Sequence, residues 1–161
     1  MHAAPLLAPR SSAMCCTHGD TLVVLGGTKG ERLRTAEVYE PRMDKWQPLA
    51  CPMIEVRSAG CAVSSANHLY AMGGINADHQ IHNSLEVLNP EGGQWAFLAP
   101  MPGPRMDSAA VFVKDSILVT GGQDGEVLSS TCFYNPETNE WRQGPSMGTP
   151  RYGHNLVVTA L

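Results

Sequence analysis

A diglycine occurs three times in the chain at a nearly constant interval. The pairs begin at Gly26, Gly73 and Gly121, so that successive copies are 47 and 48 residues apart. A repeat of this length is one small unit that cannot bury its apolar face alone, and it is stabilised by stacking on its neighbours. The interval therefore predicts a chain built from similar sheets packed side by side.

Other residues recur in register with the diglycine. An arginine precedes it by 16 residues each time, at Arg10, Arg57 and Arg105. Four further marks follow each diglycine in a fixed order, namely an aromatic residue or leucine (Tyr39, Leu88, Tyr134), a proline (Pro41, Pro90, Pro136), a tryptophan (Trp46, Trp95, Trp141) and a methionine (Met53, Met101, Met147). The diglycine residues Gly26, Gly27, Gly73, Gly74, Gly121 and Gly122 and the three tryptophans are predicted to be structural.

Each repeat reads as four short strands. Apolar runs at 22–25, 69–72 and 117–120 come directly before the diglycines and are typical of strands. Runs of small residues follow the arginines, which suits strands crowded around a common axis. The diglycine ends a strand where the backbone needs a positive φ or a close approach, and the tryptophans are expected to fill the space between sheets. No segment shows a sustained apolar period of 3.6 residues, so no helix is predicted.

The series of arginine, diglycine, Tyr-x-Pro and tryptophan resembles the kelch repeat over nearly the whole chain. The resemblance implies an all-β fold, a β-propeller with four strands per blade. The second copy departs from the pattern at two places: Leu88 replaces the tyrosine, and two extra residues fall in the loop 75–83. A surface loop tolerates such an insertion.

The expected architecture is an incomplete kelch β-propeller of three four-stranded blades plus one inner strand of a further blade. The predicted divisions are 1–10 (tail of a preceding repeat), 11–57, 58–105 and 106–151 (the three repeats) and 152–161 (first strand of a further repeat). Closed propellers have about four to eight blades, so the chain is expected to be the C-terminal half of a longer protein: a truncated gene model, a splice form or a fragment. Open terminal blades expose strand edges, which predicts self-association.

The repeats are similar in style to those of BTB-kelch proteins, whose propellers hold substrates for a cullin-type ubiquitin ligase. The resemblance implies a non-catalytic module for a protein or peptide ligand, connected to the ligase through a missing upstream domain, because nothing in the chain resembles a BTB domain. Partner contacts are expected from residues just after each arginine and in the loop after each diglycine: Ser11, Ser12, Lys29, Arg32, Ser58, Asn76, His79, Met106, Asp107, Gln123, Asp124, Glu126 and Tyr152. The alternatives are a cytoskeletal (actin-binding) or scaffold propeller, a fragment of a copper oxidase-like propeller, and a truncated product without function.

Composition excludes several other classes. The net charge is −4 with both signs interspersed, and no basic block indicates nucleic acid. No apolar run approaches the ~20 residues of a membrane span, and no signal peptide begins the chain. The 5 cysteines form no CxxC pair and are expected to be reduced thiols, which favours a cytoplasmic, nuclear or cytoskeletal location.

Catalytic chemistry has little support in the sequence. His79 and His82 share a loop with Asp78, but a metal site needs further ligands on a rigid frame, and a solvated loop is the favoured interpretation. The resemblance to kelch-type propellers of copper oxidases implies tyrosine, histidine and cysteine ligands. The tyrosines of this chain, Tyr39, Tyr70, Tyr134 and Tyr152, fall mostly at repeat positions and are better explained by packing. The sequence predicts no catalytic residue, no cofactor and no metal ligand.

Overall fold

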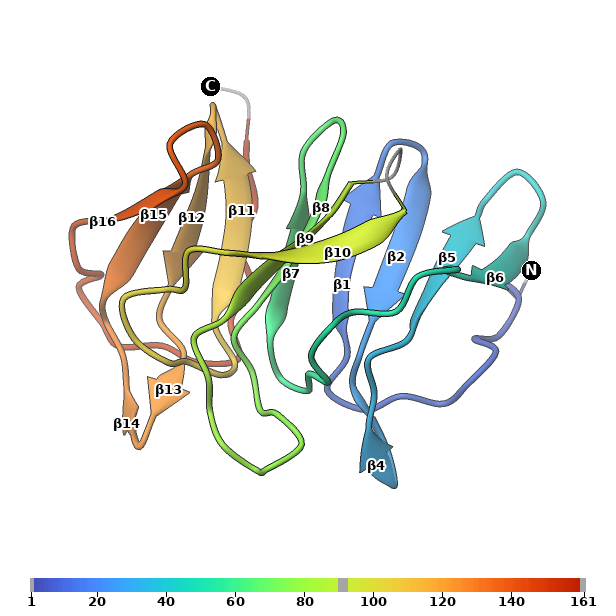
Figure 1. Ribbon diagram of the computed structural model, residues 1–161, viewed down its shortest axis with the longest axis horizontal. Coiled ribbons are helices and arrows are strands. Elements are labelled where there is room, and N and C mark those ends of the chain that lie inside the picture. Colours follow the sequence, from blue (N-terminus) through green and yellow to red (C-terminus); the bar gives the residue numbers. More distant parts are fainter. Residues whose placement is uncertain (1, 90–92, 160–161) are drawn as a thin grey trace.

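Three four-stranded antiparallel sheets, each one blade, make up the chain (Figure 1). The structure is a computed structural model that describes residues 2–89 and 93–159, and no helix occurs in that part of the chain. Blade 1 consists of β1 (Met14–His18), β2 (Thr21–Leu25), β5 (Ala36–Glu40) and β6 (Lys45–Pro48). Blade 2 consists of β7 (Cys61–Ser64), β8 (Leu69–Met72), β9 (Leu85–Asn89) and β10 (Gln94–Leu98). Blade 3 consists of β11 (Ala109–Val113), β12 (Ser116–Thr120), β15 (Thr131–Asn135) and β16 (Glu140–Gln143).

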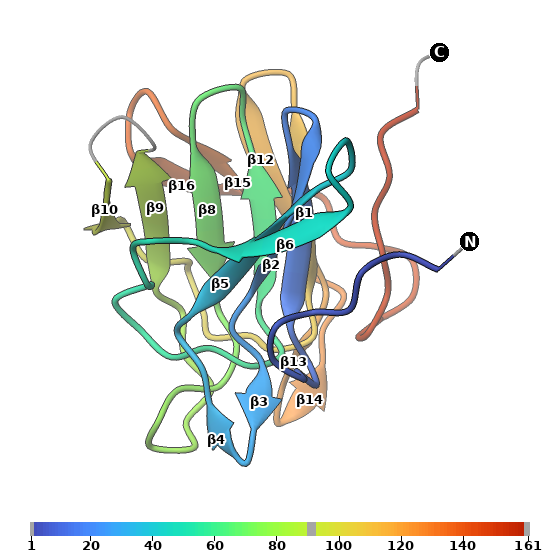
Figure 2. The ribbon, with the colours of Figure 1, turned by 90° about the vertical axis from the view of Figure 1, so that its right-hand side faces the viewer.

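Two small hairpins interrupt the blades between their second and third strands. They are β3 (Thr28–Lys29) with β4 (Glu31–Arg32), and β13 (Gln123–Asp124) with β14 (Glu126–Val127). The innermost strands β1, β7 and β11 lie next to one another. In the view turned by 90°, β1 lies toward the side on which both chain ends are seen (Figure 2). The all-β architecture of an open, incomplete propeller is therefore confirmed.

The tryptophans lie on the outermost strand of each blade, as predicted. Trp95 pairs with Leu88 across β10 and β9 and is 7% exposed. It belongs to an apolar cluster that joins blades 1 and 2 and includes Leu25, Met53 and Leu69. A second cluster joins blades 2 and 3, and Trp141 packs against it. The indoles therefore help to fill the space between neighbouring blades.

The same indoles also hold the segment that enters their own blade. The Nε1–H groups of Trp46, Trp95 and Trp141 donate hydrogen bonds to carbonyl oxygens of the entering segments, at Ala4 (2.9 Å), Cys51 (3.0 Å) and Ala99 (2.7 Å) respectively. Each entering segment is thus tied to the outermost strand of the blade that follows. This satisfies the indole N–H, which would otherwise be buried without a partner.

The diglycine is required by a close approach between repeats. Gly73 and Gly74 have φ values of 60° and 91°, in the left-handed region that side chains rarely adopt. A Cβ at Gly73 would lie 2.5 Å from the carbonyl oxygen of Arg105, the last residue before the third repeat, and the Gly74 N–H donates to that same oxygen at 2.9 Å. A side chain at this position would therefore push the two repeats apart.

A line of main-chain hydrogen bonds connects the repeats at the hub. Ala59 N–H donates to Ser12 O (2.9 Å), Asp107 N–H to Ala59 O (2.7 Å), and Gly153 N–H to Asp107 O (2.8 Å). These four residues occupy the same place, two positions after the arginine, and all have positive φ values between 51° and 62°. We call this line of bonds the hub ladder.

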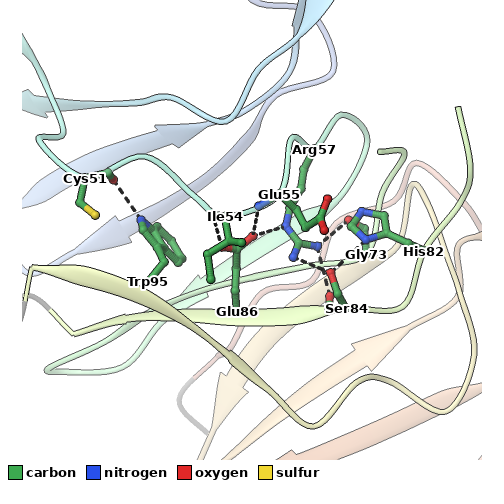
Figure 3. A network of polar contacts seen from close by, with 9 residues as sticks. All are labelled: Cys51, Ile54, Glu55, Arg57, Gly73, His82, Ser84, Glu86 and Trp95. Carbon is green, nitrogen blue, oxygen red and sulfur yellow. Dashed lines mark hydrogen bonds and ion pairs between the residues drawn. The ribbon is translucent and has the colours of Figure 1, made fainter. Parts of the chain in front are cut away.

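The repeated arginine is the centre of a buried clasp (Figure 3). Arg57 and Glu86 form an ion pair at 2.9 Å, and both side chains are 0% exposed. Arg57 Nη1 also donates to the carbonyl oxygens of Gly73 and Ser84. The carboxylate of Glu86 accepts in turn from the N–H groups of Ile54 (2.7 Å) and Glu55 (3.4 Å).

Blade 1 has an equivalent clasp. Arg10 Nη2 lies 2.9 Å from Glu37 Oε1, and the Glu37 carboxylate accepts from the N–H groups of Leu7 and Ala8. Each carboxylate thus binds both the arginine and the segment that leads into the blade. Buried charges are usually paired and hydrogen-bonded in this way, because burial of an unpaired charge is costly.

One expected strand is not seen. Residues 152–161 were expected to form the first strand of a further blade, and the described part of this segment, 152–159, contains no strand. A strand requires a ladder partner for its N–H and C=O groups, and the described chain places no second strand of that blade beside them. Pro90, the proline mark of the second repeat, lies outside the described residues.

Candidate functional site

The loops that follow the diglycines all project from one face of the blades. In Figure 1 the β3–β4 hairpin, the loop 75–83 and the β13–β14 hairpin extend from the lower edge. We call this surface the loop face. The tight turns between the first and second strands of each blade project from the opposite face.

The residues after the arginines join the same face. Isolated β-bridges connect Ser11 with Thr28, Ser58 with Ile75, and Met106 with Gln123. Each bridge connects the start of a repeat to the loop that follows the diglycine of the same repeat. The two groups of residues that the sequence singled out are therefore brought together.

The exposure of the predicted partner-binding residues varies. The exposed ones are Ser11, Ser12, Lys29, His79, Asp124, Glu126 and Tyr152, and the half-buried ones are Arg32, Asn76, Met106, Asp107 and Gln123. Ser58 is the exception, since it is 4% exposed and has no surface for a partner. Its hydroxyl accepts a hydrogen bond from Arg32 Nε at 3.1 Å, which holds the Arg32 side chain in place.

Arg32 bridges blades 1 and 2 on the loop face. Besides its bond to Ser58, its Nη1 lies 3.1 Å from Nδ1 of His79, a residue 47 positions later in the neighbouring repeat. The loop that carries His79 is itself ordered by Asn76, whose side-chain oxygen accepts from the N–H groups of Asp78 and Gln80 at 3.0 Å. Arg32 is therefore held in place by two neighbours.

A cleft of about 590 Å³ opens beside Arg32. Its lining residues come from the first two repeats: Thr28, Gly30, Glu31, Arg32, Val56, Ala77 and His79. The sequence analysis named Arg32 and His79 among these residues, and it did not name Thr28, Gly30, Glu31, Val56 and Ala77. Glu31 and Ala77 lie in the diglycine loops already singled out, whereas Val56 directly precedes Arg57 and carried no signal of its own.

The blade 3 end of the loop face has a different character. Gln123 Nε2 donates to Asp107 Oδ2 at 3.1 Å, which fixes both side chains. Asp124 and Glu126 extend from the hairpin into solvent. This end therefore presents carboxylates, whereas the blade 1 end presents Arg32.

Other candidate chemistry is dispersed. Within residues 2–89 and 93–159, no group of three or more His, Cys, Asp or Glu side chains is placed to hold a metal ion. His79 contacts Arg32, whereas His82 contacts Ser84. Burial raises the pKa of the Cys61 thiol to about 11, despite a hydrogen bond with Ser108 and the nearby arginines, so that it stays neutral at pH 7.

The tyrosines of the oxidase alternative are engaged in contacts within and between the blades, and Tyr70 and Tyr134 share the cluster between blades 2 and 3. Tyr39 donates to Asp44 (2.7 Å) and Tyr134 donates to Asn139 (2.9 Å), each within its own blade. Tyr70 is buried beside Phe112. Tyr39, Tyr70 and Tyr134 thus have packing contacts or hydrogen-bond partners, whereas Tyr152 is exposed.

His82 gives the domain a pH dependence. Burial, with a smaller effect of the Arg57 charge, lowers the pKa of His82 from 6.5 to about 4. Below pH 6.5 the unfolded chain binds a proton that the folded chain does not, so stability is present at neutral pH and is lost as pH falls from 6.5 toward 4. Urea unfolding between pH 7 and 4.5 is expected to show a shallower fall for His82→Gln than for wild type.

The loop variant His79→Gln controls for the general loss of an imidazole. If the free energy of unfolding of wild type and of His82→Gln fell equally with pH, His82 would not be the source of the pH dependence.

A protein-family comparison identifies the repeats. The model of the KLHDC2/KLHL20/DRC7 Kelch-repeats domain matches residues 3–160. The chain belongs to this kelch-repeat family. The kelch assignment made from the arginine, diglycine and tryptophan series is thereby confirmed.

Several kelch relatives share about a third of the residues. Mouse Kelch-like protein 35 is 30% identical over 130 residues, covering 80% of this chain and 22% of that protein. Kelch-like protein 26 of Danio rerio is 31% identical, covering 79% of this chain and 22% of that protein. The spermatocyte protein spe-26 of Caenorhabditis elegans is 32% identical, covering 71% and 20% respectively. The chain thus spans about a fifth of the length of these relatives.

A solved structure supports the fold. The structure of YjhT has a TM-score of 0.77 with this chain at 16% identity, covering 89% of this chain and 54% of that one. At this identity the likeness concerns the fold alone. Separately, the described part of the kelch chain contains no helix long and apolar enough to cross a membrane.

Proposed function

We propose that this kelch domain is a non-catalytic protein-interaction module whose loop face binds a peptide or protein surface. The observation that carries the proposal is the contrast between the buried frame and the loop face. The arginine of the clasp is buried in all three blades and pairs with a buried glutamate in blades 1 and 2, whereas the loops after the diglycines differ between repeats in length and charge. Binding specificity is commonly carried by such variable loops on a rigid scaffold.

The charges of the loop face suggest how a partner is oriented. Blade 1 contributes the cations Lys29 and Arg32 with one carboxylate, Glu31, whereas the blade 3 hairpin contributes Asp124 and Glu126. Complementary charges steer and orient partners. A partner segment with acidic groups toward blade 1 and basic groups toward blade 3 fits this arrangement.

Within this class we propose substrate recognition for a cullin-type ubiquitin ligase, in the cytoplasm. The support is the similarity to Kelch-like proteins and the resemblance of the repeats to BTB-kelch propellers. Because the chain spans only part of those relatives, its connection to a ligase requires a further domain or a separate protein.

Loop-face variants test the binding function. Arg32→Ala and Gln123→Ala together are expected to weaken partner binding at least about tenfold, which corresponds to about 1.4 kcal/mol. The free energy of unfolding is expected to change by less than about 1 kcal/mol, because both side chains are only half-buried and water can reach the groups that they leave behind. Asp115→Ala, in the exposed turn between β11 and β12, serves as the matched control on the other face.

The experiment has two measurements. Quantitative affinity capture from cells compares wild type, the loop-face double variant and the control, and urea unfolding follows the stability of each. A ligase role predicts that the proteins lost specifically from the double variant accumulate when cullin neddylation is inhibited. A double variant that is destabilised but retains its partners would show that the loop face is structural. Captured proteins whose cellular levels do not change when neddylation is inhibited would favour a scaffold role.

A further inference from the structure

The third arginine clasp lacks its carboxylate. In the first two blades the acceptor lies on the third strand, where Glu37 pairs with Val24 and Glu86 pairs with Ala71. The corresponding residue of blade 3, paired with Val119, is Cys132. The thiol Sγ stands where a glutamate has Cγ, so the missing group is the carboxylate itself.

Arg105 is buried nonetheless. It is 5% exposed, and its Nη1 and Nη2 donate to Gly121 O (2.9 Å), Ser130 O (3.3 Å) and Ser130 Oγ (3.2 Å). Its Nε, the atom that meets the carboxylate in the other two clasps, is buried and has no hydrogen-bond partner among the described residues. No ion pair joins Arg105 to an acidic side chain in that part of the chain.

The cysteine does not supply the missing charge. Burial raises the pKa of Cys132, and the smaller opposing effect of Arg105 leaves the thiol neutral at pH 7. Among the described residues the guanidinium is therefore a buried cation without a counter-ion, whereas buried charges in proteins are usually paired.

A pocket lies where the carboxylate would be. It has a volume of about 240 Å³ and is lined by Gly103, Arg105, Thr131, Cys132 and Gln143, among others. A Cβ at Gly103 would meet nothing within 4 Å, so the space beside it is open. Pro102 stands where blade 2 has Ile54, so that one of the two N–H donors to the carboxylate is absent together with the carboxylate, whereas Gly103 retains the other.

We propose that this pocket binds a carboxylate group supplied from outside the chain, by a small organic acid or by an acidic side chain of a bound peptide. The Nε–H of Arg105 and the N–H of Gly103 take the roles that Arg57 Nε and the Glu55 N–H have toward Glu86. Arginine presents its N–H groups in a fixed fork that matches carboxylate geometry, and a charge-assisted bond of this kind is roughly twice as strong as a neutral one. The site is separate from the residues of the proposed loop-face function and does not depend on a ligase role.

Acetate is the first probe, and its binding is detected by NMR of the arginine Nε–H groups. The ionic strength is held constant, and chloride serves as the reference anion. Acetate is expected to shift the Arg105 Nε–H resonance saturably. The resonances of Arg10 and Arg57, whose Nε atoms already bind internal carboxylates, serve as internal controls and are expected to stay in place.

Two variants of Cys132 sharpen the test. Cys132→Glu supplies the carboxylate from within, so that Arg105 is expected to resemble Arg57 without acetate and the affinity for acetate to fall at least about tenfold. Cys132→Ser keeps the pocket and is expected to respond as wild type. An Arg105 resonance that ignores acetate in both wild type and Cys132→Ser would overturn the proposal, as would an unchanged acetate response in Cys132→Glu.

A second pair of probes distinguishes the sources of the carboxylate. These are a short peptide with blocked ends and one glutamate, and its glutamine counterpart. If the glutamate peptide binds more tightly than acetate and the glutamine peptide does not bind, an acidic side chain is the source of the carboxylate. If acetate binds and neither peptide does, the source is a small acid. Equal binding of both peptides at Arg105 would contradict carboxylate recognition.

Discussion

Replacing Glu86 with alanine is expected to destabilise the domain by about 3–5 kcal/mol, because it leaves the Arg57 charge buried without its partner. Both side chains are fully buried and lie 2.9 Å apart. The substitution also removes the acceptor of the Ile54 and Glu55 N–H groups, which hold the segment leading into blade 2. A loss of this size is a large part of the 5–15 kcal/mol that typically stabilises a domain.

Urea unfolding at neutral pH measures the effect. Asp20→Ala is the matched control, because Asp20 also pairs with an arginine, Arg42, but both side chains are 87% exposed. An exposed pair of this kind contributes little, so the control is expected to unfold as wild type does. Glu86→Gln, which keeps one oxygen as an acceptor, is expected to fall between wild type and Glu86→Ala. A Glu86→Ala variant as stable as Asp20→Ala would show that the clasp is dispensable.

Replacing Trp95 with alanine is expected to cost about 3–5 kcal/mol, as is usual for a large aromatic side chain removed from a packed core. Trp95 is 7% exposed, and it contributes to the cluster between blades 1 and 2 as well as the hydrogen bond to Cys51. Because repeat domains are held together by nearest-neighbour interfaces, the loss is expected to fall on one interface in particular. Blades 1 and 2, which meet at that interface, are therefore expected to unfold less cooperatively.

Trp46→Ala provides the comparison. Trp46 has the same place in blade 1 and makes the same type of bond, to Ala4, but its side chain is only half-buried against Tyr39. The smaller area it removes from water predicts a smaller loss of stability. Urea titrations of both variants, read by far-UV circular dichroism, check the order. Equal losses would mean that the inter-blade cluster adds nothing beyond the bond to the entering segment.

The parts of the fold that were predictable are those in which one residue type meets a steric requirement. Gly73 must be glycine because a Cβ would strike Arg105, and Trp95 must be large because it fills a gap between sheets. Requirements of this kind recur with the repeat and leave a visible spacing in the sequence. The resemblance to kelch repeats follows from the same spacing.

Other features depend on neighbours that a spacing does not reveal. The strand expected after Tyr152 does not form, because the hydrogen bonds of a strand belong to a pair and not to a sequence. Ser58 was expected on the surface, but Arg32 from the previous repeat covers it. In both cases the outcome is decided by a partner from another segment.

The unequal clasps did leave a signal that went unused. Glu37 and Glu86 each stand two residues before the aromatic or leucine mark, and Cys132 stands at the same place before Tyr134. Aligning the three copies on that mark would have shown that one arginine lacks its acid. The signal was hidden because Glu37 and Glu86 resembled ordinary polar positions of a half-exposed strand.

The hub ladder has a consequence for how such a domain can change. Its bonds from Ala59 to Ser12, from Asp107 to Ala59 and from Gly153 to Asp107 use only N–H and C=O groups, which every residue except proline provides. The alignment of one repeat with the next therefore requires a residue that tolerates a positive φ, but no particular side-chain chemistry. Mutations can alter the chemistry displayed beside the axis while the geometry that displays it is inherited intact, and a lineage of such domains can acquire new binding preferences without first losing its shape.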